Sequence, residues 1–223
     1  MVIFFDIDDT LVDHGSAIRA AVETLHRTVA VNISLEEFFL AWTSALKRHF
    51  DRYLAGELSY ESQRRARVRE TIDPTMSDEA ADRVFATYLA SYEAHWRLFP
   101  DVLPCLERLA RYRLGVISNG QAAQQRSKLQ RTGILDRFDG VLISEECGCA
   151  KPNAAIFHRA CSMVEESPQQ SVYVGDLYDV DTVAARAAGL TGIWLDRAGR
   201  VSVEHAPPMI HSLAQLEEAM KAG

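Results

Sequence analysis

Acidic side chains follow the first apolar run of the chain. The run Val2 to Phe5 leads directly into Asp6, Asp8 and Asp9. Side chains two positions apart on extended backbone point the same way, so we expect Asp6 and Asp8 to face one site. A pair of carboxylates suits metal binding, or acid–base catalysis by two groups with separated pKa values. Acidic residues also gather at strand ends without any chemical role, so this pair alone does not define a site.

A second acidic group lies late in the chain. Asp176, Asp179 and Asp181 fall within six residues, directly after another apolar run. Carboxylates at this spacing repel one another unless a cation lies among them. Ligation by oxygen atoms alone, with room for water and phosphate, favours Mg²⁺ over zinc. The sequence therefore predicts a Mg²⁺ site.

Two further polar segments precede helical patterns. Ser118 and Asn119 offer a hydroxyl and backbone N–H groups, which form an anion site at a helix N-terminus or simply cap the helix. Lys151 also lies at the start of a helical segment, where a positive charge opposes the helix dipole. We expect carboxylates or a phosphate to fix this lysine, the alternative being a solvated surface side chain.

These residues must be positioned by the elements around them. Five apolar runs of strand length, bounded by turn residues, lie at 2–5, 114–117, 140–143, 171–174 and 192–195. Helical periodicity separates the later runs, at 101–111, 121–132, 153–164 and 181–188, and a last helix is predicted from Ser212 with Gln215 as its capping-box partner. Buried strands alternating with helices predict an α/β fold with a doubly wound parallel sheet. Ligands bind such sheets at the carboxyl ends of the strands, where the polar segments lie.

The segment 14–98 breaks this alternation, because it shows helical patterning and no strand. A capping box at Ser34 begins one helix, and further helices are predicted at 59–72 and 77–96. An insertion of this length predicts a separate helical domain, with 1–13 and 99–223 forming the core. Its aromatic and histidine side chains suit a helical bundle core better than base stacking; they are Phe38, Phe39, Trp42, His49, Tyr53 and Trp96.

Composition limits the partners. The formal net charge is −7, with 48% hydrophobic and 25% charged residues. An acidic excess disfavours a nucleic-acid polymer or an anionic membrane surface, but not a small phosphorylated molecule. The apolar start is too short for a signal peptide or a membrane span. Cys147 and Cys149 form a C-x-C that suits small apolar packing better than a redox or metal role. We expect a cytoplasmic protein, a monomer or a homodimer.

Taken in order, the four polar segments resemble the haloacid dehalogenase superfamily of phosphatases. The matching segments are Phe4-Phe5-Asp6-Ile7-Asp8-Asp9-Thr10-Leu11, Ile117-Ser118-Asn119-Gly120, Lys151-Pro152 with Ile156-Phe157, and Gly175-Asp176 with Asp181. The resemblance covers the whole chain and implies a Rossmannoid hydrolase core with an inserted, all-helical cap at 14–98. Two segments, 118–133 and 143–157, look most like the pyrimidine 5′-nucleotidase branch.

The resemblance implies a Mg²⁺-dependent hydrolysis of phosphate monoesters in two steps. Asp6 would be the nucleophile, and Asp8 would protonate the leaving alcohol and then deprotonate the attacking water. Lys151 would offset the repulsion between Asp6 and the phosphate. Ser118 and the Asn119 N–H would hold the phosphoryl oxygens.

The resemblance also implies a metal set. Asp6 and Asp176 would bind Mg²⁺ through their carboxylates, Asp8 through its backbone carbonyl, and Asp181 through water. Asp179 is an extra acid, which leaves open whether Asp179 or Asp181 is the supporting one. Two further residues complete the candidate site: Thr10 would orient the phosphate-binding loop, and His14 is the first candidate for substrate contact.

Other functions of this fold differ at identifiable residues. Haloacid dehalogenases lack an acid two residues after the nucleophile, so Asp8 favours phosphoryl transfer. A phosphomutase would need water excluded from the aspartyl-phosphate, and a phospho-accepting signalling module is half this length. The predicted substrate is a small phosphorylated metabolite, such as a nucleoside 5′-monophosphate, with phosphoglycolate or a sugar phosphate as the alternative.

Overall fold

The computed structural model describes residues 1–199 and 208–222, so positions 200–207 and 223 of the expected core lie outside it. Its contacts divide the chain into two compact units, Met1–Asp13 with Arg97–Gly223, and His14–Trp96. The second unit ends two residues before the expected boundary. The reason is local pairing: the Asp13 N–H donates to the Arg97 carbonyl at 2.9 Å, and Leu98 bridges to Val12.

The first unit is built on one parallel sheet, as the sequence predicted. Its strands run in the order β3-β2-β1-β4-β5-β6. They are β1 (Val2–Phe5), β2 (Arg113–Ser118), β3 (Gly140–Ile143), β4 (Ser171–Gly175), β5 (Thr191–Leu195) and β6 (Met209–Ile210). The predicted α/β class is confirmed by this topology. The sixth strand was missed because two residues carry no readable periodicity.

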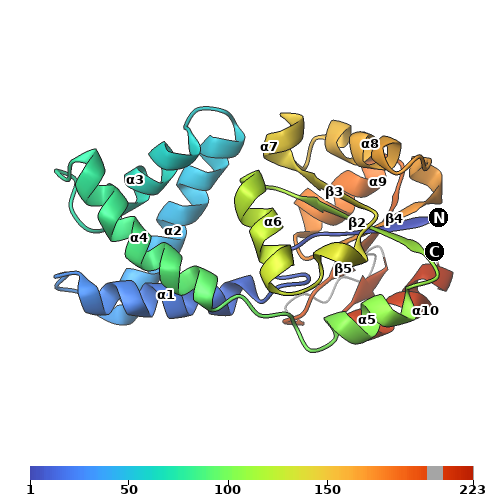
Figure 1. Ribbon diagram of the computed structural model, residues 1–223, viewed down its shortest axis with the longest axis horizontal. Helices are drawn as coiled ribbons and strands as arrows, with labels where there is room; N and C mark the ends of the chain where they lie inside the picture. The colour runs from blue at the N-terminus through green and yellow to red at the C-terminus, as the bar shows by residue number, and fades with distance from the viewer. Residues whose placement is uncertain (200–207, 223) are drawn as a thin grey trace. The chain divides into compact units, whose positions relative to one another are not determined.

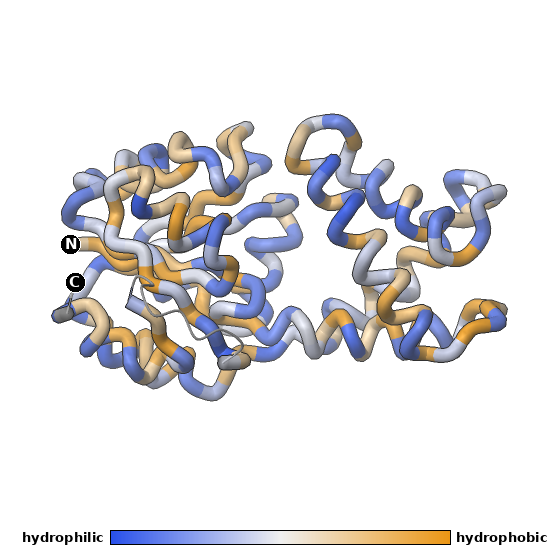
Figure 2. Tube along the Cα trace, turned by 180° about the vertical axis from the view of Figure 1, so that it is seen from behind, coloured by the Kyte–Doolittle hydropathy of each residue, from blue (hydrophilic) through white to orange (hydrophobic). Residues whose placement is uncertain are grey.

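Strand β1 lies at the centre of the sheet, between β2 and β4. Val2 pairs with Arg113 on one side and Ser171 on the other, and all four β1 side chains are fully buried. Figure 2 shows the hydrophobic residues running along the strands in the middle of this unit. At Gly115 of β2, a Cβ atom would lie 2.5 Å from the Phe4 ring, so only glycine lets the two strands pack here.

Helices cover both faces of the sheet. In Figure 1, α8 and α9 lie on one side of the strands and α5 and α10 on the other. The helices of this unit are α5 (Val102–Arg108), α6 (Ala122–Arg131), α7 (Ser144–Cys147), α8 (Ala154–Met163), α9 (Ala184–Ala187) and α10 (Leu216–Ala222), with short turns η1 (Leu135–Arg137), η2 (Pro168–Gln170) and η4 (Leu213–Gln215). The capping box predicted at Ser212 is confirmed, although its first turn is 3₁₀.

The helix predicted over 181–188 differs from the structure. The chain turns earlier, through a π-helical segment η3 (Tyr178–Val183), before α9 begins. A π-turn is wider than an α-turn and is frequent at functional sites. The pattern read at 3.6 residues per turn could not reveal this widening.

The second unit contains four helices, α1 (His14–Thr28), α2 (Leu35–Leu54), α3 (Tyr60–Thr71) and α4 (Asp78–Ala94). The predicted capping box is confirmed, since Ser34 and Glu37 exchange side-chain and backbone hydrogen bonds. Along α2 the buried face consists of Phe38, Trp42, Ala45 and His49. Trp42 packs against Phe38, Phe85 and Tyr88, as in a bundle core.

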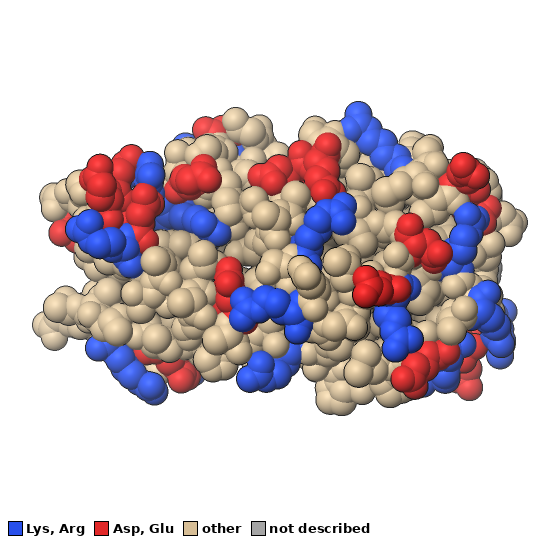
Figure 3. Space-filling view, viewed as in Figure 1, with Lys and Arg blue, Asp and Glu red and all other residues tan. Residues whose placement is uncertain are grey.

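Surface charge is mixed in sign. On the face in Figure 3, acidic and basic side chains are interspersed. Within the described part of the chain, no helix combines the length and apolarity that crossing a bilayer requires.

Candidate active site

The end of β1 places the first acidic pair. The Asp6 N–H donates to the Val174 carbonyl of β4 at 2.9 Å, which fixes Asp6 between two neighbouring strands. The chain then closes a tight turn, in which the N–H groups of Leu11 and Val12 both donate to the Ile7 carbonyl. Asp9 adopts the left-handed region at φ 53°, which is uncommon outside glycine and typical of functional turns.

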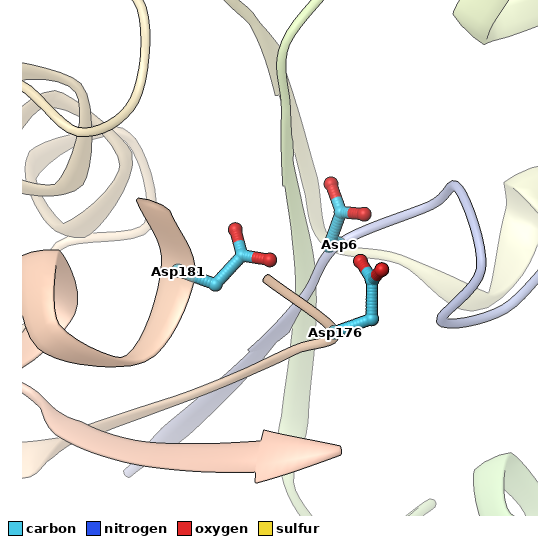
Figure 4. A group of neighbouring side chains, drawn as sticks. All are labelled: Asp6, Asp176 and Asp181. Carbon is cyan, nitrogen blue, oxygen red and sulfur yellow. The ribbon is translucent and has the colours of Figure 1, made fainter. Parts of the chain in front are cut away.

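Two further carboxylates converge on Asp6. Oxygen atoms of Asp6, Asp176 and Asp181 lie within 4.8 Å of one another. Figure 4 shows Asp6 at the end of β1, Asp176 directly after β4 and Asp181 on η3. The carboxyl groups of the three side chains lie close to one another. Asp181 is fully buried, whereas Asp179 is exposed, so the turn of η3 selects Asp181 for the cluster. Of the two candidate acids, the structure brings this one to Asp6.

Burial and repulsion shift the pKa values of this cluster. Burial first, and then the charges of Asp6, Asp181 and Asp9, raise the pKa of Asp176 to about 9. Burial also raises the pKa of Asp6 to about 7, with Lys151 opposing the shift and Asp181 and Asp8 adding to it. Concentrated negative charge of this kind is what a bound cation would neutralise.

The donor set fits Mg²⁺. The three groups offer carboxylate oxygens only, the hard ligands that this ion prefers over the nitrogen and sulfur ligands of zinc. Asp181 is already engaged, because its Oδ1 accepts from Lys151 and its Oδ2 from the Leu177 N–H at 2.9 Å. Asp6 and Asp176 are therefore the residues with most capacity left to hold the ion.

Lys151 lies inside this acidic group and not on the surface. Its Nζ is 2.7 Å from Asp6 Oδ1, 2.7 Å from Asp181 Oδ1 and 2.6 Å from the Tyr173 hydroxyl. Burial opposes its charge, but Asp181 and Asp6 more than compensate and raise the pKa of Lys151 above its ordinary value. The lysine is therefore a fixed positive charge beside Asp6.

Asn119 has a role in the structure that its sequence position did not reveal. Its side chain accepts from the Lys151 N–H at 2.8 Å and donates to the Lys151 carbonyl at 2.9 Å. This amide pairing attaches the end of β2 to the backbone of Lys151. The expected contribution of Asn119, a backbone N–H toward phosphate, stays a prediction.

Tyr173 was missed by sequence reasoning. It belongs to β4, where an aromatic residue among valines looks like ordinary strand packing. Its hydroxyl lies 3.1 Å from Asp181 Oδ1 and donates to the Ile117 carbonyl at 3.0 Å. Burial, Asp181 and Asp6 hold the pKa of Tyr173 well above its usual range, so the group remains a neutral hydroxyl.

Helix α6 contributes two further residues that sequence reasoning missed. Gln125 Nε2 donates to Asp8 Oδ2 and to Ser118 Oγ, each at 2.9 Å, and Lys128 Nζ forms an ion pair with Asp8 Oδ1. Ser118 is almost completely buried at the end of β2. The only signal in the sequence was the three-residue spacing of Gln125 and Lys128, which places both on one helix face.

The remaining candidate residues differ in placement. Thr10 is fully buried, and its hydroxyl has no hydrogen-bond partner among the described residues. His14 begins α1 in the helical unit, where its Nδ1 lies 2.7 Å from the Tyr92 hydroxyl. Cys147 and Cys149 are free thiols, with their sulfur atoms 3.2 Å apart, packed against the apolar core.

The fold and the site together define a doubly wound α/β enzyme with a carboxylate centre at the carboxyl ends of its central strands. The family model of the haloacid dehalogenase-like hydrolases matches residues 1–189. The chain belongs to this family, which confirms the resemblance found in the sequence.

Known proteins of this family are similar over about half of the chain or more. A glyceraldehyde 3-phosphate phosphatase of Methanopyrus kandleri is 33% identical over 212 residues, covering 87% of this chain and 83% of the relative. The pyrimidine 5′-nucleotidase YjjG of Escherichia coli is 38% identical over 111 residues, 48% of this chain and 49% of that protein. The solved 2-haloacid dehalogenase of Pseudomonas syringae pv. Tomato is 29% identical, with a TM-score of 0.72, covering 99% of this chain and 98% of that structure.

Proposed function

We propose that this enzyme is a phosphatase that hydrolyses phosphate monoesters of small metabolites, with Mg²⁺ and an aspartyl-phosphate formed on Asp6. The observation that carries the proposal is the position of Asp6. Its carboxylate lies close to those of Asp176 and Asp181, and its Oδ1 is 2.7 Å from Lys151 Nζ. A carboxylate nucleophile needs positive charge around it, because it must approach a dianionic phosphate.

The first step transfers the phosphoryl group to the enzyme. A bond forms between an Asp6 carboxylate oxygen and phosphorus as the bond to the leaving alcohol breaks. Asp8 gives its proton to the departing oxygen, and Lys151 offsets the charge on the phosphoryl group. Ser118 Oγ and the Asn119 N–H hold the phosphoryl oxygens.

The second step releases inorganic phosphate. Asp8, now ionised, removes a proton from a water molecule that attacks phosphorus. The bond between phosphorus and Asp6 breaks, which restores both carboxyl groups to their starting states. Asp8 thus serves as the general acid in the first step and as the general base in the second.

Mg²⁺ would be held by the carboxylates of Asp6 and Asp176 and the backbone carbonyl of Asp8, with Asp181 acting through water. When bound, it supplies the charge that offsets repulsion between the phosphate and the acidic cluster. Asp179, which is exposed and outside the cluster, has no part in this site.

A small phosphorylated metabolite is the substrate class we propose. The similarity to YjjG supports a nucleoside 5′-monophosphate, and the relative from Methanopyrus kandleri supports a sugar or triose phosphate. A phosphate-release screen over nucleotides, sugar phosphates and phosphoglycolate separates these classes. Replacing His14 by Ala should change KM for the best substrate more than kcat, if this residue contacts the substrate.

Substitution of Asp6 tests the reaction directly. We expect Asp6→Asn to lower phosphate release by a factor on the order of 10³ or more, since an amide cannot form the intermediate. Asp179→Asn is the matched control and should stay near wild type. Full activity of Asp6→Asn would overturn the proposal.

The metal has a readout that does not depend on turnover. We expect Mg²⁺ to raise the thermal unfolding temperature of the wild type, because a ligand that binds only the folded state stabilises it. Asp176→Asn should abolish this rise and chelation of Mg²⁺ should abolish activity. Turnover that persists in chelator would contradict the metal requirement.

A haloacid dehalogenase is the second candidate, and the similarity to the Pseudomonas syringae structure favours testing it. Such an enzyme forms a carboxylic ester on the same aspartate and needs no cation. Chloride release from 2-chloropropionate, together with no phosphate release from any ester, would replace our proposal by this one.

A further inference from the structure

Both carboxylate oxygens of Asp8 are held by helix α6. Lys128 Nζ pairs with Oδ1, and Gln125 Nε2 donates to Oδ2 at 2.9 Å. The side chains come from adjacent turns of one helix, and their residues are only 1% and 3% exposed. The two donors are therefore buried, whereas the Asp8 side chain that they hold is 28% exposed.

Packing alone does not explain these residues. The buried face of α6 consists of Gln125, Lys128 and Leu129, so two of its three members are polar. A buried ammonium group is costly unless it is paired and hydrogen-bonded, and the carboxylate of Asp8 supplies such a pairing. The site thus contains two buried lysines paired with aspartates, Lys151 with Asp6 and Asp181, and Lys128 with Asp8.

Gln125 connects two parts of the site. Besides Asp8, its Nε2 lies 2.9 Å from Ser118 Oγ and 3.2 Å from the Asn119 carbonyl. One amide group therefore sets the separation between the carboxyl of Asp8 and the hydroxyl at the end of β2. A shift of Gln125 would move both groups relative to each other.

We propose that Lys128 and Gln125 are positioning residues that orient the Asp8 carboxyl toward the oxygen that receives or loses a proton. This inference rests on the proposed function, in which Asp8 is the acid and the base. Each carboxylate oxygen has two lone-pair sites, so an oxygen that accepts from one of these donors can still take part in proton transfer. Neither residue touches the phosphorus or forms a bond during the reaction.

The role predicts a dependence on the leaving group. An alkoxide leaves only with a proton, whereas a nitrophenolate leaves without one. Misplacing Asp8 must therefore slow the first step for an alkyl ester far more than for a nitrophenyl ester. The ratio kcat/KM reports substrate binding and this step but not the release of phosphate, because it covers events up to the first irreversible one.

The experiment compares benzyl phosphate with p-nitrophenyl phosphate, two esters of similar size. We expect Lys128→Met to lower kcat/KM for benzyl phosphate about 100-fold and for p-nitrophenyl phosphate by at most about fivefold. Lys128→Arg, which keeps the charge, should recover part of the loss on benzyl phosphate. In an Asp8→Asn background, Lys128→Met should cause no further loss of this selectivity.

Matched variants keep the test decisive. Gln125→Met should show the same selective loss, and it decides the matter if Lys128→Met does not fold. Gln130→Met, at an exposed position of the same helix, and Lys221→Met are controls that should match wild type. Equal losses on both esters, or no loss, would overturn this inference while leaving the phosphatase intact. A wild-type enzyme that hydrolyses neither ester nor any metabolite would instead overturn the proposed function.

Discussion

Lys151 is held at both ends. Its backbone pairs with the Asn119 amide, and its ammonium group meets Asp6, Asp181 and the Tyr173 hydroxyl. A long side chain has considerable rotamer freedom, and each of these contacts removes part of it before a substrate arrives. The position of the charge is therefore set by the folded protein and not by the ligand.

Tyr173→Phe tests this arrangement. We expect the free energy of unfolding to fall by about 1–3 kcal/mol, because a buried hydroxyl bonded to charged groups is lost. We also expect kcat to fall about tenfold, since Lys151 and Asp181 lose the group between them. Urea unfolding and steady-state kinetics measure the two effects. Tyr112→Phe, whose hydroxyl contacts Arg111, is the control, and an unchanged kcat in Tyr173→Phe would refute the role.

At this scale the sequence predicted the acids and Lys151, but not Tyr173, Gln125 and Lys128, which contact them. Asp6 and Asp181 stand out because each belongs to a group of closely spaced acids that follows an apolar run of strand length. Tyr173 does not, because an aromatic residue in β4 is equally well explained by strand packing. Gln125 and Lys128 lie on a helix rich in polar residues, where burial of an amide and an amine leaves no trace in the pattern.

Segment η3 brings Asp181 to the sheet only because two glycines make room for it. A Cβ at Gly175 would lie 2.4 Å from Asp181 Cγ, and one at Gly192 would lie 2.5 Å from the Thr182 carbonyl. The segment thus rests directly on the backbones of β4 and β5. The wide turn of η3 and the absence of a side chain at Gly175 and Gly192 together place the Asp181 carboxylate.

Gly175→Ala is expected to displace Asp181. Overpacking should lower stability by about 1–3 kcal/mol, and the effect of Mg²⁺ on the unfolding temperature should shrink together with kcat. Gly140→Ala is the matched control, because its Cβ would be overpacked as well, against Met163 Cε at 2.6 Å and Val164 Cγ1 at 2.8 Å, without meeting any of the acids. Wild-type activity and Mg²⁺ response in Gly175→Ala would show that η3 tolerates the shift.

The element pattern was predictable where periodicity was regular. Five strands and the main helices follow from alternating apolar runs, since burial on both faces of a parallel sheet leaves a continuous signal. The departures are local: the π-turn of η3, the two-residue β6, and the boundary at Trp96. Each depends on a backbone hydrogen bond or a close approach that no side-chain pattern encodes.

At the scale of the whole core, Asp101 joins distant parts of the chain. It accepts from Arg197, Ser212 Oγ and the Leu213 N–H, at 2.7 to 3.0 Å. Burial works against its charge, but these hydrogen bonds prevail and hold the pKa of Asp101 below its ordinary value. The Asp101 carboxylate therefore links the start of α5, the end of β5 and the start of η4.

This lowered pKa makes a pH-dependent prediction. Because the pKa is lower in the folded than in the unfolded chain, the stabilisation is complete above about pH 4 and is lost as pH falls through the folded value. Asp101→Asn should therefore cost about 1–2 kcal/mol at pH 7 and progressively less toward pH 3. Urea unfolding across this range measures the gap, with exposed Asp136→Asn as control. A gap that is constant with pH would contradict the mechanism.

The central position of β1 has a consequence for synthesis of the chain. Strand β1 precedes both of its partners along the chain, because it pairs with residues 113–116 and 171–174, so it has no strand partner until β2 has been made. Meanwhile the whole helical unit, His14–Trp96, is completed and can fold through contacts that are close in sequence. Asp6 therefore ends an unpaired apolar segment during this time, and the last of its neighbours to be made is Asp181 on η3, after the strand that carries Tyr173.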